Sequence, residues 1–303
     1  MSNIFDQISM VAANFGNANV YREVLDEWLA FLGGRPGEIL VIDGGSDLAT
    51  QEIYWDLFRK GVIDKLQVIQ SKHPENSKNT CYYQEHAAGA LACKPYLFWY
   101  KIDTLPYRKG HEKWVEEAIA LLDRPDVFAV SGSFNRDNRH HDVMPGWFAT
   151  QHCSMNFALM KREMYMAAME EGAGRYIASG SRGENPFGDP AGPGRFVMEG
   201  SWVRYMHNHN LFTLARYEDE SWTVFHTNLT GEKLAQARRD NLARKDVKKY
   251  MNAANFSVKG DYYAYYGQPL LTPIQKIRIA FGLSPAGPFW RAVKKSVHGP
   301  NPM

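Results

Sequence analysis

Charged side chains stand directly after two apolar runs of this sequence, where a strand would meet solvent at a sheet edge. Asp43 ends the run EILVID before two glycines and a serine, and Lys101 and Asp103 follow the run YLFWY. A carboxylate at a strand end, with flexible backbone behind it, can accept hydrogen bonds from a ribose or a base. The same residues are equally typical of a glycine-rich turn in which Ser46 or Asp47 caps the next helix. Both interpretations stay open, and Lys101 with Asp103 raises the question of a metal, a phosphate or neither.

Strands alternating with helices must position these residues. Short apolar runs alternate with stretches whose apolar residues recur at helical spacing. We expect strands at 8–13, 38–43, 65–70 and 96–102, with helices at 17–34, 50–61 and 79–93 between them. This alternation predicts right-handed crossovers and a Rossmann-like α/β fold with a mostly parallel central sheet flanked by helices. Ligands of such sheets bind beyond the carboxyl ends of the strands, which here are followed by residues 14–17, 43–47, 71–73 and 101–104.

The regular alternation ends after a helix at 109–125 and a strand at 126–132. Polar residues fill 132–147, and Gly, Pro and Ser dominate 172–195, so we expect loops there, the second of them mobile. The remaining pattern predicts helices at 160–172, 199–210 and 230–251 and strands at 211–217 and 222–228, with Thr230 as a cap of the last helix.

The composition excludes several classes of protein. The 303 residues are 45% hydrophobic and 22% charged with a net charge of +2, which suits a folded protein and gives no sign of nucleic-acid binding. Three cysteines without close pairing argue against a zinc or redox motif and for a reducing compartment. The chain begins without a secretory pattern and contains no apolar run of membrane-spanning length. We expect a cytoplasmic protein, or one on the cytosolic face of a membrane.

Three segments in order resemble the family-2 glycosyltransferases of the GT-A fold. They are ISMVAANFGNANVYREVLDEWL, EILVIDGGSD and HAAGALACKPYLFWYKID, and the likeness covers about residues 8–131 before it resumes around 198–231. The resemblance implies a GT-A domain over residues 1–250, with a nucleotide-binding half at 1–131 and an acceptor-side half at 132–250. Residues 251–303 would form a C-terminal helical extension.

The resemblance also implies a site for a nucleotide-diphosphate sugar. Asn14 and Phe15 would lie near the base, and Asp43 would contact the base or the ribose. His86 stands at a position where the family often has Asn, and Trp202 also lies within the matched segments and is assigned to the donor site. No GxGxxG or Walker pattern is present, which weakens dinucleotide and P-loop alternatives.

The triplet Lys101, Ile102 and Asp103 matches the family's Asp-x-Asp signature in its last residue only. The resemblance assigns the triplet to the diphosphate, and Asp103, with His226 after a late strand, to a divalent cation, Mn²⁺ or Mg²⁺. Lys101 departs from the pattern, and four interpretations stay open: it donates to phosphate or ribose oxygens, it pairs with Asp103, it marks a site that has lost activity, or it is an exposed strand-end residue. His226 could equally be structural.

Glu199 is the expected catalytic base. In the segment VMEGSWVRYM it matches the family's acceptor-activating carboxylate, although Met198 replaces the first acid of the family's pair. A glutamate in the first turn of a helix also suits the helix dipole without any catalysis. The acids at 218–220 are weaker candidates in an expected turn, and His140, His141 and Asp142 are more typical of a solvated loop than of an acceptor site.

The predicted function is transfer of a sugar, such as a hexose, from a nucleotide-diphosphate sugar to a glycan or lipid-linked acceptor, with inversion, as in polysaccharide biosynthesis. Basic and apolar residues share the segment 272–297, which could contact an anionic membrane or pack on the domain. The alternatives are a non-catalytic nucleotide-sugar or glycan-binding protein of the same fold, which Lys101 favours, and a nucleotidyltransferase, which should carry a basic glycine-rich loop that NFGNANVYRE lacks.

Overall fold

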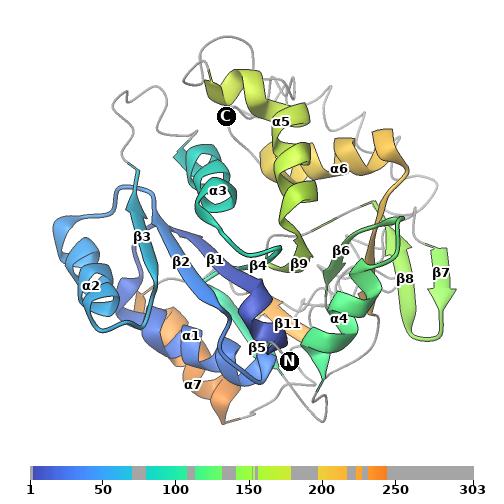
Figure 1. The fold of residues 1–303 in the computed structure, drawn as a ribbon. Helices are drawn as coiled ribbons and strands as arrows, with labels where there is room; N and C mark the ends of the chain where they lie inside the picture. The colour runs from blue at the N-terminus through green and yellow to red at the C-terminus, as the bar shows by residue number, and fades with distance from the viewer. Residues whose placement is uncertain are drawn as a thin grey trace, which may run out of the picture.

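The computed structural model describes residues 3–69, 80–107, 113–131, 141–151, 153, 156–178, 197–216, 223–226 and 231–243. Within these ranges one nine-stranded sheet has the order β3-β2-β1-β4-β9-β6-β10-β8-β7, and β5 with β11 forms a small second sheet (Figure 1). The large sheet contains β1 (Ile8–Asn14), β2 (Glu38–Asp43), β3 (Lys65–Val68), β4 (Tyr96–Tyr100), β6 (Val127–Ser131), β7 (His141–Met144), β8 (Trp147–Thr150), β9 (Phe157–Lys161) and β10 (Phe212–Arg216). The small sheet pairs β5 (Thr104–Tyr107) with β11 (Thr223–His226).

The helices lie on both faces of the large sheet. They are the 3-10 turn η1 (Ile4–Gln7) and the α-helices α1 (Ala18–Leu32), α2 (Leu48–Arg59), α3 (Thr80–Leu91), α4 (Trp114–Leu122), α5 (Arg162–Ala178), α6 (Val197–His209) and α7 (Gly231–Leu242). Figure 1 shows α1 and α7 on one side of the sheet and α3, α5 and α6 on the other.

Most strands of the large sheet run in one direction. The register pairs β1 in parallel with β2 and β4, and β2 with β3, while β9 is antiparallel to both of its neighbours and β8 to both of its own. All strands of this sheet except β8 and β9 therefore point the same way. The predicted α/β fold with a mostly parallel central sheet is confirmed, and the carboxyl ends of β1 to β4 meet at one edge.

Strict alternation of side chains gives the sheet two cores. In β1 Met10 and Ala12 pack toward α1, whereas Val11 packs toward α3, α5 and α6. In β4 Phe98 and Tyr100 take the α1 side, and their odd-numbered neighbours take the other. Runs that are apolar at every position are expected for strands buried on both faces. The sign of this alternation decides which side of the sheet each strand-end residue faces.

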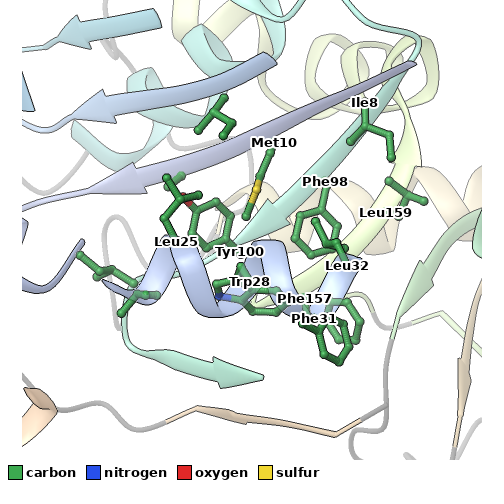
Figure 2. Close-up of a cluster of buried hydrophobic side chains, with 14 of the residues drawn as sticks. Ile8, Met10, Leu25, Trp28, Phe31, Leu32, Phe98, Tyr100, Phe157 and Leu159 are labelled. Carbon is green, nitrogen blue, oxygen red and sulfur yellow. The ribbon is translucent and has the colours of Figure 1, made fainter. Parts of the chain in front are cut away.

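Aromatic side chains dominate the core beneath α1. Figure 2 shows Trp28 and Phe31 of α1 against Phe98, Tyr100 and Phe157 of the strands, and the ring centroids of Trp28 and Phe98 are 5.3 Å apart. Trp28 is fully buried. The helix ends where Gly33 adopts a left-handed φ of 85° and donates its N–H to the carbonyl of Leu29. These contacts fix α1 under the strands whose ends form the candidate site.

Two predicted loops are partly regular structure. The expected loop at 132–147 contains β7, whose His141 and Asp142 lie on an edge strand paired with β8, because edge pairing needs no apolar run. The expected loop at 172–195 begins inside α5, which continues to Ala178. Strands β5, β8 and β9 were not predicted.

Other predictions concern residues outside the described ranges. Thr230, His140, the acids at 218–220, residues 71–73, the extension at 251–303 and the basic segment at 272–297 all lie there. None of the helices that the structure describes combines the length and the apolar character needed to cross a bilayer.

Candidate functional site

Hydrogen bonds from α3 hold the carboxyl ends of β1 and β2 together. The buried Gln84 donates its side-chain amide to the carbonyls of Asn14 at 2.8 Å and Ile42 at 2.7 Å. The N–H of Gly44 donates to the same Asn14 carbonyl at 2.9 Å. A β-carbon on Gly44 would lie 2.9 Å from the Gln84 side-chain oxygen, so the close approach needs glycine there. The two strand ends and α3 therefore form one ordered unit.

Asp43 is buried at the end of β2 and shapes the turn after it. Its carboxylate accepts hydrogen bonds from the N–H groups of Gly45 at 3.1 Å and Ser46 at 2.9 Å, and from the Ser46 hydroxyl. The Ser46 hydroxyl also accepts from the N–H of Gly16 at 2.8 Å, which joins this turn to the loop after β1. Asp47 caps α2 by accepting from Thr50, and this hydrogen bond lowers the pKa of Asp47. The predicted glycine-rich turn and helix cap are thus present. They do not depend on whether Asp43 also contacts a ligand.

The loop after β1 presents an exposed aromatic ring. Asn14 donates its side-chain amide to the carbonyl of Gly16 at 2.8 Å and to the hydroxyl of Tyr54 on α2. Gly16 and Asn17 both adopt left-handed φ angles, 67° and 55°. Phe15, directly before them, is 68% exposed. An aromatic side chain on an ordered loop can stack on a base.

Lys101, Ile102 and Asp103 form the turn that joins β4 to β5. Alternation puts Ile102 in the core beneath α1, so the preceding Lys101 belongs to the side of α3, α5 and α6. Thr104 closes the turn by donating its N–H and its hydroxyl to the Lys101 carbonyl, the first at 3.2 Å. The positive charge of Lys101 acts on Glu85 of α3, where burial raises the pKa and this charge lowers it.

The backbone of β11 returns to this turn. Its antiparallel register with β5 places His226 opposite Thr104, next to Asp103 along the chain. Residues 103 and 226 are therefore neighbours at one edge although more than a hundred positions separate them. Among the residues that the structure describes, no group of three or more His, Cys, Asp or Glu side chains could hold a metal ion.

Glu85 on α3 is a buried carboxylate that the sequence analysis missed. The residue is 5% exposed, and within the described ranges its carboxylate takes part in no hydrogen bond or salt bridge. Burial raises the pKa of Glu85 to about 8; the positive charge of Lys101 opposes the rise and the negative charge of Glu199 adds to it. Three charged side chains from α3, the end of β4 and the start of α6 thus influence one another.

Glu199 lies in the first turn of α6 and is half-buried. Its charge also acts on the buried Cys153: burial raises the pKa of the Cys153 thiol, a hydrogen bond with Thr213 opposes the rise, and the charge of Glu199 adds to it. The charge of the expected base therefore acts on Glu85, and α6 contacts α3 on the same side of the sheet.

Two predicted donor-site residues, Trp202 and His86, contact other protein side chains. Trp202 is fully buried between Phe128 and Tyr165, with ring centroids 6.1 and 5.9 Å away, so it packs in the core beneath α6. His86 lies beside Glu170 of α5, with 3.4 Å between Nε2 and Oε1. Gln84, which bonds the ends of β1 and β2, and the buried Glu85 are the residues of α3 that the sequence did not indicate. The sequence signal that could have indicated Glu85 is its acidic side chain in the mostly uncharged helix YYQEHAAGAL.

A pocket of about 490 Å³ lies at the opposite edge of the sheet. Cys93, Lys94, Tyr96, Lys161 and Arg162 line it, at the start of β4 and the end of β9. Ligands of parallel sheets bind at the carboxyl ends, and the strand-end side chains described above lie there. We therefore place the candidate site at the carboxyl edge despite this pocket.

Comparison with known proteins gives similarities of shape at low sequence identity. A mannosyltransferase from Pyrobaculum calidifontis, PcManGT in complex with GDP-Man and Mn2+, is 16% identical with a TM-score of 0.48, over 97% of this chain and 76% of that one. TarS of S. aureus is 12% identical with a TM-score of 0.43, over 84% of this chain and 46% of that one, so this chain spans less than half of TarS. A mycobacterial protein is 14% identical with a TM-score of 0.41, over 78% and 73%.

No protein-family model matches the chain, and no curated protein matches it in sequence. At these TM-scores and identities the shape similarities support no conclusion about activity. The fold stands on the sheet order and register given above.

The raised pKa of Glu85 predicts how stability changes with pH. From about pH 4.3, the ordinary pKa of an unfolded glutamate, to about pH 8, the folded protein holds one more proton than the unfolded chain. The free energy of unfolding should therefore fall as pH rises through this window, by up to about 1.4 kcal/mol per pH unit from this group. Urea unfolding measures the free energy of unfolding of wild type and Glu85→Gln at pH 5, 6, 7 and 8. At each higher pH, the free energy of unfolding of the variant should increase relative to that of wild type.

The exposed Glu116 of α4 gives the matched control, because solvent surrounds its side chain. Glu116→Gln should follow the wild-type pH profile. A stability difference between wild type and Glu85→Gln that stays constant from pH 5 to 8 would contradict the buried, proton-holding state of Glu85.

Proposed function

We propose that this protein is a glycosyltransferase that moves a sugar from a nucleotide-diphosphate sugar to a glycan or lipid-linked acceptor, with inversion. The observation that carries the proposal is the meeting of three strand ends at one sheet edge. The ordered loops after β1 and β2 and the turn after β4 lie there, and the charges of Lys101 in that turn and of Glu199 both act on Glu85. The order of motifs that resembles the family-2 glycosyltransferases supports the same assignment.

The donor nucleotide would lie across the ends of β1, β2 and β4. Phe15 would stack on the base, and the turn that Asp43 holds would face the ribose. The diphosphate would lie at Lys101 and Asp103, where the lysine ammonium can donate to phosphate oxygens as a compact charge.

A divalent cation fits this arrangement with few protein ligands. Mg²⁺ is commonly held by one or two carboxylates together with substrate phosphates, so a cluster of three protein ligands is not required. Asp103 and His226, adjacent through the register of β5 and β11, are the residues that would hold it. When bound, the cation would neutralise charge on the departing nucleotide diphosphate.

Glu199 would act as the general base. Its carboxylate would accept the proton of the acceptor hydroxyl while that oxygen forms a bond to the anomeric carbon of the sugar. The bond from that carbon to the diphosphate oxygen breaks, and the nucleotide diphosphate leaves with the electron pair. Attack from the face opposite the leaving group inverts the anomeric centre.

Lys101 favours a second candidate function, a non-catalytic nucleotide-sugar or glycan-binding protein of the same fold. The lysine stands where the resembled family carries a carboxylate, and its charge interacts with Glu85. A site of this kind would bind a donor through the same strand ends without transferring the sugar. Turnover separates the two functions.

Nucleotide binding tests the donor site. Isothermal titration with UDP, GDP and dTDP, each with Mn²⁺ and with chelator, should show binding of at least one nucleotide that weakens in chelator. Asp103→Asn should remove most of the Mn²⁺-dependent gain, because a neutral amide attracts a cation less than a carboxylate does. The exposed Asp123 at the end of α4 gives the control variant Asp123→Asn, which should bind as wild type does. Absence of binding for all three nucleotides in both conditions would remove the proposal.

Release of free nucleotide from a donor tests catalysis. Glu199→Gln should lower the rate by about 10²- to 10⁴-fold, the range that general-base catalysis contributes, while donor affinity stays near wild type. Glu232→Gln alters another glutamate in a first helical turn, that of α7, and should leave the rate unchanged. Donor binding by wild type without turnover of any donor would favour the binding protein instead.

A further inference from the structure

Glu85 is the one buried acid of the candidate site that the proposed roles leave without a partner in the described residues. It is 5% exposed, and its carboxylate makes no hydrogen bond or salt bridge there. Asp43, the other buried acid at this edge, accepts three hydrogen bonds from its own turn. A mostly buried carboxyl group without a hydrogen bond to the described residues can bind a polar group of a ligand that reaches it.

The backbone around Glu85 is held rigidly. The hydroxyl of Tyr165 donates to the Glu85 carbonyl at 2.6 Å, and the neighbouring Gln84 is tied to the ends of β1 and β2. One turn further along α3, a β-carbon on Gly89 would lie 2.3 Å from the Tyr165 ring, so α3 and α5 are in close contact. These contacts hold α3 in place, so the helix cannot shift to bring the Glu85 carboxyl group to another hydrogen-bonding partner.

The charges around Glu85 come from the two functional parts of the site. Lys101 belongs to the proposed diphosphate turn, and Glu199 is the proposed base. The carboxyl group of Glu85 interacts with both, from the same side of the sheet. A sugar in transit from diphosphate to acceptor must lie between these two parts.

We propose that Glu85 is a specificity-determining residue whose carboxyl group hydrogen-bonds a hydroxyl of the transferred sugar between Lys101 and Glu199. The inference rests on the proposed glycosyltransferase function and names the part of the donor that this side chain recognises. A hydroxyl suits the group because it donates and accepts hydrogen bonds, whichever proton state the carboxyl group has. A phosphate or carboxylate there would face the negative charge of Glu199, and an apolar group would leave Glu85 unpaired.

The protonation of Glu85 agrees with this role. Burial keeps its pKa near 8, so at neutral pH the carboxyl group can donate a hydrogen bond as well as accept one. A site built to hydrogen-bond a hydroxyl rejects a ligand that lacks it, because the buried group is then left unpaired.

The alternative role for Glu85 is a purely structural countercharge for Lys101. Removing such a countercharge would change the affinities for the nucleotide diphosphate and the nucleotide sugar equally, since both ligands carry the diphosphate near Lys101. A sugar-binding residue affects the nucleotide sugar alone. The difference in affinity between the two ligands therefore separates the roles.

The experiment titrates each nucleotide diphosphate and its sugar ester into the full chain: UDP and UDP-glucose, GDP and GDP-mannose, dTDP and dTDP-glucose. For a pair that binds wild type, Glu85→Leu should lower the affinity for the nucleotide sugar by about 10- to 100-fold and leave the affinity for the nucleotide diphosphate unchanged. Glu85→Gln, whose amide also donates and accepts, should stay closer to wild type than Glu85→Leu. Glu170→Leu on the exposed face of α5 should change neither affinity, and thermal unfolding confirms that each variant is folded.

The outcomes distinguish the two proposals. Binding of neither ligand of any pair by wild type overturns the glycosyltransferase assignment and this inference with it. Binding of both ligands by wild type, with Glu85→Leu changing both equally or neither, overturns the role of Glu85 alone and leaves the donor site standing.

Discussion

The two hydrogen bonds from the Gln84 amide to the strand ends of β1 and β2 are the constraint on which the candidate site depends. They fix α3 against the carbonyls of Asn14 and Ile42, at the edge where parallel strands end. The loops that carry Phe15 and Ser46 are joined to the same place through the N–H of Gly16. Because Glu85 directly follows Gln84 on the helix, the same anchor brings an unpaired carboxyl group to this edge. Without the Gln84 hydrogen bonds, α3 and the ends of β1 and β2 would lose the contact that holds them together.

Electrostatics gives the site its asymmetry. At the ends of β1 and β2, the buried Asp43 is fully hydrogen-bonded within its own turn and the ring of Phe15 is exposed. This part of the edge suits the weakly charged parts of a nucleotide. The β4 side presents Lys101 and Asp103, and the charges of Lys101 and Glu199 both act on Glu85 of α3. Opposite charges so arranged favour a ligand with a negative and a hydroxyl-rich part, because each part finds a complementary group.

Much of the fold was predictable because its strands are apolar at every position and its helices have clear periodicity. The sheet from β1 to β4, the two strand-end motifs and the cap at Asp47 follow from those signals. Strands β5 and β7 to β9 were not predicted; β7 is polar and β9 adjoins a helix pattern. In the site, the sequence indicated His86 but not the neighbouring buried Glu85, because neighbouring residues on a helix point about 100° apart and α3 has no strong apolar stripe to fix its rotation. Trp202 lies on the same helix as Glu199, and its ring packs in the core. The rotation of a helix depends on tertiary packing, which the sequence pattern does not show.

The central claim is that the carboxyl edge of the sheet binds the nucleotide and its cation, and paramagnetic broadening of amide NMR signals by Mn²⁺ tests it most directly. With a nucleotide diphosphate present, Mn²⁺ should broaden most strongly the signals of residues 14–16, 44–46 and 101–104. Signals at the start of β4 and around the pocket at the opposite edge, near Tyr96 and Arg162, should broaden least. Strongest broadening at that opposite edge, or equal broadening at both, would contradict the account.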